Sequence, residues 1–157
     1  MKKIYYIKSF LFVLLLVAID QITKYLSVIY LKDINSFPII KGILEFTYLE
    51  NYGAAFGMLQ NKTWFFILLT IVVSIFLVVH FYRISKAGTM PMVPSLLLVL
   101  LSGAIGNFID RILYGFVVDF IYVRIINFPV FNVADCYVTI SVALLIIYLL
   151  FIYKDEE

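Results

Sequence analysis

The sequence predicts an all-α integral membrane protein with four transmembrane helices and a small extracytoplasmic β-sheet between the first and second helices. Of its 157 residues, 64% are hydrophobic and only 14% are charged, which is outside the usual range for a soluble domain. A helix needs roughly 20 apolar residues to cross the hydrocarbon layer, which leaves room for about four crossings and one modest loop. The chain is therefore expected to form one membrane domain, with spans at 7–31, 64–82, 92–113 and 133–153 and a loop at 32–63.

Composition excludes several classes of function. The net charge is only +2 and there is no basic run, so no nucleic acid partner is expected. The single cysteine, Cys136, excludes an internal disulfide and a cysteine metal cluster, and we interpret it as a small apolar filler. The basic N-terminus and first apolar run resemble a secretory signal peptide. However, the polar stretch Asp20–Lys24 follows them instead of a small-residue cleavage site.

The first span contains a short polar stretch, Asp20–Lys24, near its C-terminal end. Asp20 and Lys24 are four residues apart, so they share one face of the helix. They could form an ion pair that neutralises itself in a packed interface. They could also anchor a polar group that enters between helices, and the two interpretations are compatible.

The loop at 32–63 is predicted to hold short strands at 37–40 and 44–49, which are rich in β-branched and aromatic residues. A small sheet on the membrane surface fits this composition. The segment 50–57 then contains two glycines and two alanines, which permit close backbone approach. Within it, Asn51 is either a turn residue or a hydrogen-bond partner for an extended substrate.

The third span ends in small and polar residues. Gly103, Asn107 and Arg111 follow one another at steps of four and form one stripe, whereas Asp110 lies on a neighbouring stripe. Close helix packing in lipid explains the glycine, and an arginine near the membrane edge can reach water with its charged end. Neither explains Asn107, because a buried amide needs hydrogen-bond partners.

Two carboxylates are predicted close to the same membrane face. Asp119 follows the third span and Asp135 begins the fourth. Charges are costly at the edge of a bilayer, so this pair indicates a functional site. Asn132, three residues before Asp135, shares its helix face and is expected to cap the fourth helix. His80 falls near the opposite face, which argues against a histidine–carboxylate metal site.

The basic residues predict the orientation. With four spans, both termini and the turn between the second and third spans lie on one side. Six basic residues in short segments fall there: Lys2, Lys3, Lys8, Arg83, Lys86 and Lys154. By the positive-inside rule that side is cytoplasmic, so the loop at 32–63, Asp119 and Asp135 face outward.

At this point the sequence resembles a known family, bacterial lipoprotein signal peptidase (signal peptidase II). Five motifs in the family's order carry the resemblance, from the first span into the fourth: Asp20-Gln-x-Thr-Lys24, Asn51-x-Gly53-Ala-Ala-Phe56, Gly103-Ala-x-Gly-Asn107-x-x-Asp-Arg111, Val118-Asp119-Phe120 and Phe131-Asn132-x-Ala-Asp135. The resemblance implies that Asp119 and Asp135 are catalytic. It also implies a supporting polar shell: Asp20, Lys24, Asn51, Gly53, Asn107, Arg111 and Asn132. Ser141 departs from the pattern, where the family would have glycine.

The implied enzyme is an aspartic endopeptidase of the bacterial cell membrane, with no metal or cofactor. Its implied substrate is a prolipoprotein with a diacylglyceryl group on a cysteine, and the peptide bond before that cysteine is cut. Two nearby carboxylates fit this chemistry, since one holds a proton while the other acts as base. We expect a monomer in contact with membrane lipid. The alternatives are a small proton or ion transporter, with polar residues across the whole membrane, and a non-catalytic scaffold for lipoproteins.

Overall fold

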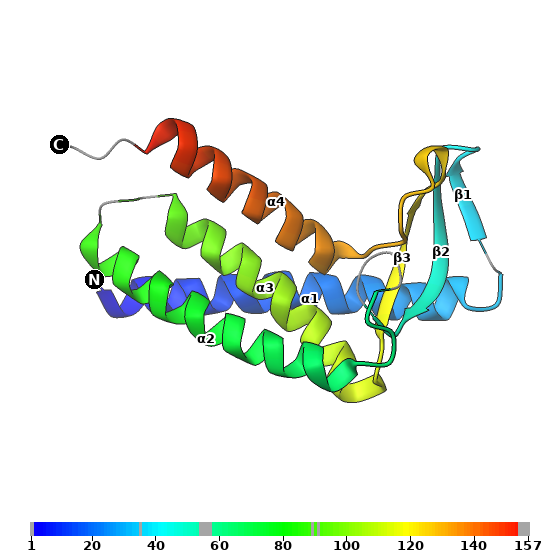
Figure 1. Ribbon diagram of the computed structural model, residues 1–157, viewed down its shortest axis with the longest axis horizontal. Helices are drawn as coiled ribbons and strands as arrows, with labels where there is room; N and C mark the ends of the chain where they lie inside the picture. The colour runs from blue at the N-terminus through cyan, green and yellow to red at the C-terminus, as the bar shows by residue number, and fades with distance from the viewer. Residues whose placement is uncertain (1, 35, 54–57, 89, 91, 154–157) are drawn as a thin grey trace.

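Four long helices run side by side, and a small sheet lies across one end of them, which we call the sheet end (Figure 1). The computed structural model describes residues 2–34, 36–53, 58–88, 90 and 92–153. Each helix is long and apolar enough to cross a membrane, as predicted. The helices are α1 (Lys2–Leu31), α2 (Thr63–Ala87), α3 (Val93–Tyr114) and α4 (Val133–Ile147), which continues into the π-helical turn η3 (Tyr148–Ile152).

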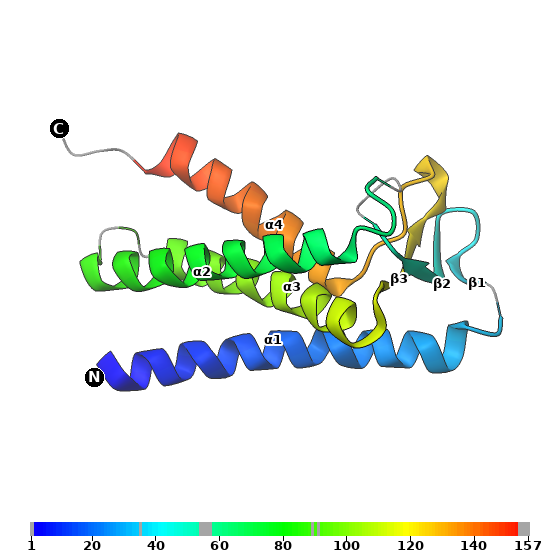
Figure 2. The same ribbon diagram turned by 60° about the horizontal axis from the view of Figure 1, so that its bottom comes forward.

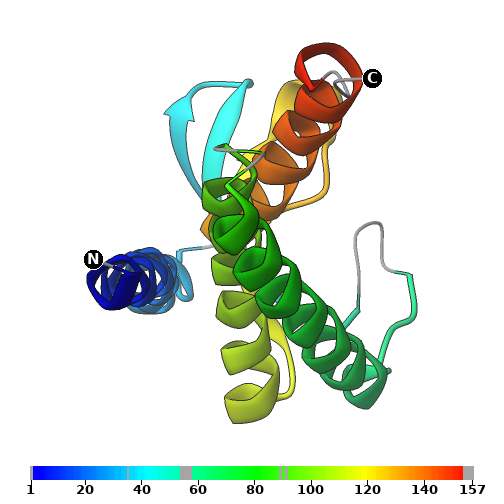
Figure 3. The same ribbon diagram turned by 90° about the vertical axis from the view of Figure 1, so that its left-hand side faces the viewer.

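Helix α3 is the centre of the bundle, since it contacts each of the other three helices. The end-on view shows α1 to one side of the others (Figure 3), and α4 leans away from α3 toward its C-terminal end (Figure 2). Two glycines of α3 make its close contacts possible. A Cβ at Gly103 would lie 2.5 Å from the Ala134 carbonyl oxygen, and one at Gly106 would collide with the Asp20 carboxylate.

Apolar and polar packing are separated along the bundle. The buried apolar core lies toward the end remote from the sheet, around the first half of α3. The buried charged side chains of the described residues lie instead at the sheet end, where the site is built. The core residues are Val13, Leu77, Phe81, Val93, Leu97, Leu98, Leu101 and Tyr148.

The sheet has three antiparallel strands in the order β1-β2-β3. Strands β1 (Ser36–Ile40) and β2 (Leu44–Asn51) come from the loop between α1 and α2, as expected. Strand β3 (Val117–Val123) comes from the connection between α3 and α4 and was not predicted. Its pairing with β2 places Asp119 opposite Leu49. The long loop and the last connection therefore meet beside the helix ends.

Helix α2 is longer than predicted. It continues past residue 82 to Ala87, so the expected basic turn at 83–86 is helical. Arginine and lysine are good helix formers, and the helix ends where Gly88 adopts a left-handed conformation with φ of 73°. Helix α1 likewise begins at Lys2 and not near residue 7. The Ala54–Gly57 part of the Asn51 motif lies outside the described residues.

Candidate active site

Asp119 and Asp135 line one cavity of about 490 Å³ at the sheet end. Asp119 comes from β3, and Asp135 lies in the first turn of α4. Some of the lining residues are polar, and we call them the polar wall; the others are mostly hydrophobic, and we call them the apolar wall. The remaining lining residues are Asn51, Gly53, Asn107, Arg111, Val117, Phe128, Pro129, Val130, Phe131, Cys136, Val138, Thr139 and Ile140.

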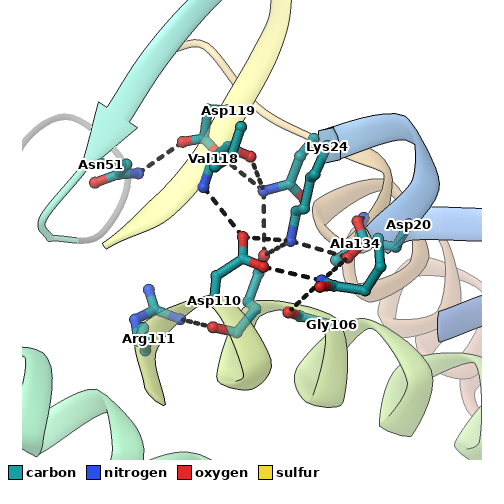
Figure 4. Close-up of polar contacts among 12 residues, drawn as sticks. Asp20, Lys24, Asn51, Gly106, Asp110, Arg111, Val118, Asp119 and Ala134 are labelled. Carbon is teal, nitrogen blue, oxygen red and sulfur yellow. Dashed lines mark hydrogen bonds and ion pairs between the residues drawn. The ribbon is translucent and has the colours of Figure 1, made fainter. Parts of the chain in front are cut away.

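The Asp119 carboxylate is almost fully enclosed, with 1% of the residue exposed. Asn51 Nδ2 donates to its Oδ2 at 2.8 Å, and Asn132 Nδ2 donates to its Oδ1 at 2.6 Å. Asn51 thus reaches Asp119 from the end of β2 (Figure 4). Burial and the nearby charge of Asp135 raise the pKa of Asp119 from its ordinary 3.8 to about 7, against the opposing effect of the two amide hydrogen bonds.

Asp135 is held by the cap of its own helix. Asn132 is the N-cap residue of α4, as predicted, and its Oδ1 accepts from Asp135 N at 3.0 Å. In return, Asp135 Oδ2 accepts from Asn132 N at 3.1 Å, which completes a capping box. Asn107 Nδ2 donates to Asp135 Oδ1 at 2.7 Å. Because Asn132 also binds Asp119, one side chain connects the two aspartates.

Lys24 determines which way the Asn107 amide points. Lys24 Nζ donates to Asn107 Oδ1 at 2.8 Å, and Asn132 Nδ2 donates to the same oxygen at 3.1 Å. An ammonium has only donors, so the amide oxygen of Asn107 must face it. The amide nitrogen is then left to donate to Asp135. Lys24 contacts neither Asp119 nor Asp135, yet it orients the Asn107 amide that donates to Asp135.

Lys24 also forms ion pairs with two buried carboxylates. Its Nζ lies 2.9 Å from Asp20 Oδ2 and 3.0 Å from Asp110 Oδ2, and all three residues are at most 3% exposed. The predicted Asp20–Lys24 ion pair is therefore present in a packed interface. Each carboxylate also accepts a main-chain N–H, from Ala134 at 2.8 Å and from Val118 at 3.1 Å (Figure 4). This cluster ties α1 and α3 to β3 and α4.

Arg111 lies at the polar wall of the cavity. It donates to the carbonyl oxygens of Gly53 at 3.3 Å and Asn107 at 3.4 Å. Its guanidinium carbon lies 4.8 Å from the centre of the Phe66 ring, which supports it by a cation–π contact. Arg111 thus links the turn after β2 to α3 and stands next to the aspartates.

The structure brings all nine predicted site residues into this region. Asn51, Asn107 and Asn132 touch the aspartates directly, whereas Asp20 and Lys24 act through neighbours. Gln21 also belongs to the site, although the sequence did not predict it, since its Nε2 donates to both Asp20 and Asp110. Its position inside the Asp20–Lys24 motif could have identified it as a site residue.

The apolar wall was also missed. It consists of the segment Phe128–Phe131 and the α4 residues Val138, Thr139 and Ile140, whose side chains carry no catalytic signal in the sequence. Cys136 lines the cavity too. Ser141 is fully buried, and its hydroxyl donates to the Tyr137 carbonyl at 2.6 Å. A serine is therefore accommodated within α4 by a hydrogen bond to its own helix.

Within the described ranges, no group of three histidine, cysteine, aspartate or glutamate side chains is arranged to hold a metal ion. The polar wall consists of carboxylates, amides and a guanidinium. Such groups can exchange protons with a bound peptide and hydrogen-bond its backbone.

Comparisons with known proteins agree with this architecture. The chain matches the family model described as signal peptidase (SPase) II over residues 12–151. It is 45% identical over 138 residues to a lipoprotein signal peptidase of Brevibacillus brevis, covering 88% of this chain and 91% of that one. It is 49% identical over 130 residues to one of Caldanaerobacter subterraneus, covering 82% and 86%.

Two solved bacterial membrane enzymes share the fold. One superposes with a TM-score of 0.84 at 40% sequence identity, covering 96% of this chain and 93% of that one. The other gives a TM-score of 0.79 at 41% identity, covering 93% and 94%. Family model, relatives and structures extend over nearly the whole chain. The chain therefore belongs to the signal peptidase II family of membrane proteases.

Proposed function

We propose that this chain is an aspartic endopeptidase that removes the signal peptide from diacylglyceryl-modified prolipoproteins, cutting before the lipid-modified cysteine. The observation that carries the proposal is the shared cavity of Asp119 and Asp135, joined through Asn132. The relatives named above are lipoprotein signal peptidases, which supports the class of substrate.

The environments of the two carboxylates suggest a division of roles. Asp119 is the more enclosed, and its raised pKa of about 7 favours its protonated form as the acid. Asp135 faces the cavity at the N-terminus of α4, where two N–H groups point at it, and is assigned as the base. The pair shares one proton and titrates as a unit.

The reaction then needs only water and these two groups. Asp135 takes a proton from a water molecule while the water oxygen attacks the scissile carbonyl carbon. Asp119 gives its proton to the carbonyl oxygen, which forms a tetrahedral diol. Asp135 next passes its proton to the leaving nitrogen, the C–N bond breaks, and Asp119 recovers a proton from the diol.

A lipid on the substrate would serve to position it. The aspartates lie where the sheet meets the helix ends, and the apolar wall of the cavity runs onto α4 at Val138 and Ile140. Acyl chains that stay among the helices would hold the scissile bond at a fixed depth, which lowers the entropic cost of reaching the reactive geometry.

The proposed orientation puts both termini in the cytoplasm and the active site at the extracytoplasmic face of the cell membrane. It rests on the basic residues of the short segments at the end remote from the sheet. In a variant without Cys136, an impermeant thiol reagent applied outside the cell should label Gln60→Cys and not Lys86→Cys. Both positions are exposed. The reverse pattern would overturn the orientation.

A transporter fits the structure less well. It would place polar groups along a path through the whole bundle. Within the described part of the chain, the buried charged side chains are confined to the sheet end: Asp20, Lys24, Glu45, Asp110 and Asp119. The apolar core fills the bundle toward the other end.

The test is cleavage of one prolipoprotein with and without its diacylglyceryl group, by purified enzyme in lipid. We expect cleavage of the acylated form only. Asp119→Asn and Asp135→Asn should each abolish cleavage, and the double variant should be hardly worse, because residues that act as a unit are non-additive. Asp33→Asn, the same change at an exposed position, is the matched control. Turnover near the parent rate in Asp119→Asn or Asp135→Asn, the two variants of the catalytic dyad Asp119–Asp135, would refute the mechanism.

A further inference from the structure

We propose that the main chain of Val130 hydrogen-bonds the main chain of the substrate beside the scissile bond, as a short added strand. This inference rests on the proposed peptidase function. The apolar wall would then align the peptide backbone with Asp119 and Asp135, in addition to holding acyl chains.

The segment that carries Val130 lies alongside β3 as an incomplete fourth strand. Phe131 and Ile121 exchange both main-chain hydrogen bonds, at 3.0 and 2.8 Å, and form an isolated antiparallel bridge. Further along, the Phe128 N–H donates to the Val123 carbonyl at 3.2 Å. One side of this segment is therefore already paired with the sheet.

The other side is open at Val130. Phe131 directs its main-chain groups to Ile121, and in extended chain the neighbouring residue directs its own to the opposite side, so Val130 turns its groups away from β3. This alternation does not continue to Phe128, whose N–H also faces β3. In the portion of the chain that the structure describes, neither group of Val130 has a hydrogen-bond partner. Val130 also lines the cavity that holds the two aspartates. Its unpaired main-chain groups are the kind that an extended peptide satisfies by adding a strand.

The edge of β3 beside Asp119 is closed at Val118. The Val118 N–H donates to Asp110, and the Val118 carbonyl accepts from Asn132 at 3.3 Å, so β3 cannot pair with a peptide there. Val130 is two residues from Asn132, which binds Asp119 at 2.6 Å. Two extended residues span roughly 7 Å. The substrate residue paired with Val130 therefore lies within about two residues of the scissile bond.

The first test replaces substrate amides by esters, which removes one N–H at a time. The parent enzyme is given a diacylated prolipoprotein peptide with an ester at each of the two linkages on either side of the scissile amide. We expect one ester to lower kcat/KM about tenfold, as loss of a single hydrogen bond does, and the others to have little effect. If no ester lowers kcat/KM, the proposal is wrong.

The second test removes the N–H of Val130 on the enzyme. Val130→Pro should lower kcat/KM about tenfold, and Val130→Ala, which keeps the N–H, should lower it less. The ester that lowers kcat/KM of the parent should lower kcat/KM of Val130→Pro by a smaller factor. The hydrogen bond removed by the ester and the one removed by proline belong to the same pair of residues, so their effects should not add. Equal losses in the proline and alanine variants, or fully additive effects, would overturn the proposal.

The controls separate folding and function from strand pairing. Thermal unfolding in detergent shows whether Val130→Pro is folded. If this variant does not fold, the ester scan on the parent enzyme alone tests the proposed hydrogen bond. If the parent enzyme does not cleave the unmodified acylated peptide, both the proposed function and the strand pairing at Val130 are wrong. If it cleaves this peptide and no ester lowers kcat/KM, only the strand pairing is wrong.

Discussion

Replacing Asp119 by asparagine should stabilise the protein at neutral pH while it abolishes cleavage. The carboxyl is 1% exposed and accepts two amide hydrogen bonds, and its pKa is raised to about 7. In the unfolded chain it ionises at its ordinary pKa of 3.8. Between these values the folded state binds the proton and the unfolded state does not, so the stability due to this group falls as pH rises.

The size of the effect follows from the shift. A difference of about three pKa units corresponds to about 4 kcal/mol of unfolding free energy. This contribution is complete below about pH 4 and is lost as pH rises through about 7, the pKa values of the unfolded and folded states. Asparagine is neutral throughout, but its NH2 group cannot accept the hydrogen bond that Asn51 or Asn132 donates to Asp119. The variant should therefore be less stable than the parent at pH 4, by about 1–3 kcal/mol for the lost hydrogen bond, and should exceed it at pH 8.

The assay is thermal unfolding of both proteins in the same detergent from pH 4 to pH 8, followed by the fluorescence of Trp64, the single tryptophan. The difference in Tm between variant and parent should shift in favour of the variant from pH 4 to pH 8, by an order of 10 °C for a chain of this size. Subtracting the parent at each pH removes the titration of groups common to both proteins.

Asp33→Asn makes the same change at an exposed position and is the matched control. A difference for Asp119→Asn that does not change with pH would show that Asp119 is not titrating in a buried site. The assignment of Asp119 as the proton-holding partner would then be wrong. A rise in stability together with loss of cleavage would separate the role of Asp119 in chemistry from any role in folding.

Three further changes test other parts of the site. Lys24→Met leaves its two buried carboxylate partners without a counter-charge and should cost about 3–5 kcal/mol, seen as a lower Tm; an unchanged Tm would contradict the ion-pair cluster. Gly103→Ala puts a Cβ 2.5 Å from the Ala134 carbonyl oxygen and should cost about 1–3 kcal/mol, whereas a neutral result would mean that α3 and α4 separate freely. Arg111→Lys loses the planar fork that reaches Gly53, so kcat/KM should fall at least about tenfold in protein that still inserts; full activity would make Arg111 a membrane-edge anchor.

The sequence by itself determined the helices and much of the polar set. Runs of apolar residues long enough to cross a bilayer predict four spans whatever the neighbouring elements do, because lipid requires each span to satisfy its own backbone. The N-cap at Asn132 was likewise predictable, since it depends on residues one turn apart. The five motifs pointed to the residues that gather at the sheet end, although their catalytic roles stay predictions.

The tertiary structure decided what depends on contacts distant in sequence. Strand β3 forms because β2, far back in the chain, is there to pair with it, and the pattern at 117–123 did not reveal that partner. The orientation of the Asn107 amide is set by Lys24, 83 residues away, and local periodicity carries no information about such a contact. The open main-chain edge at Val130 has no side-chain signature at all, because every residue except proline carries the same N–H and C=O, and only the fold determines which are left unpaired.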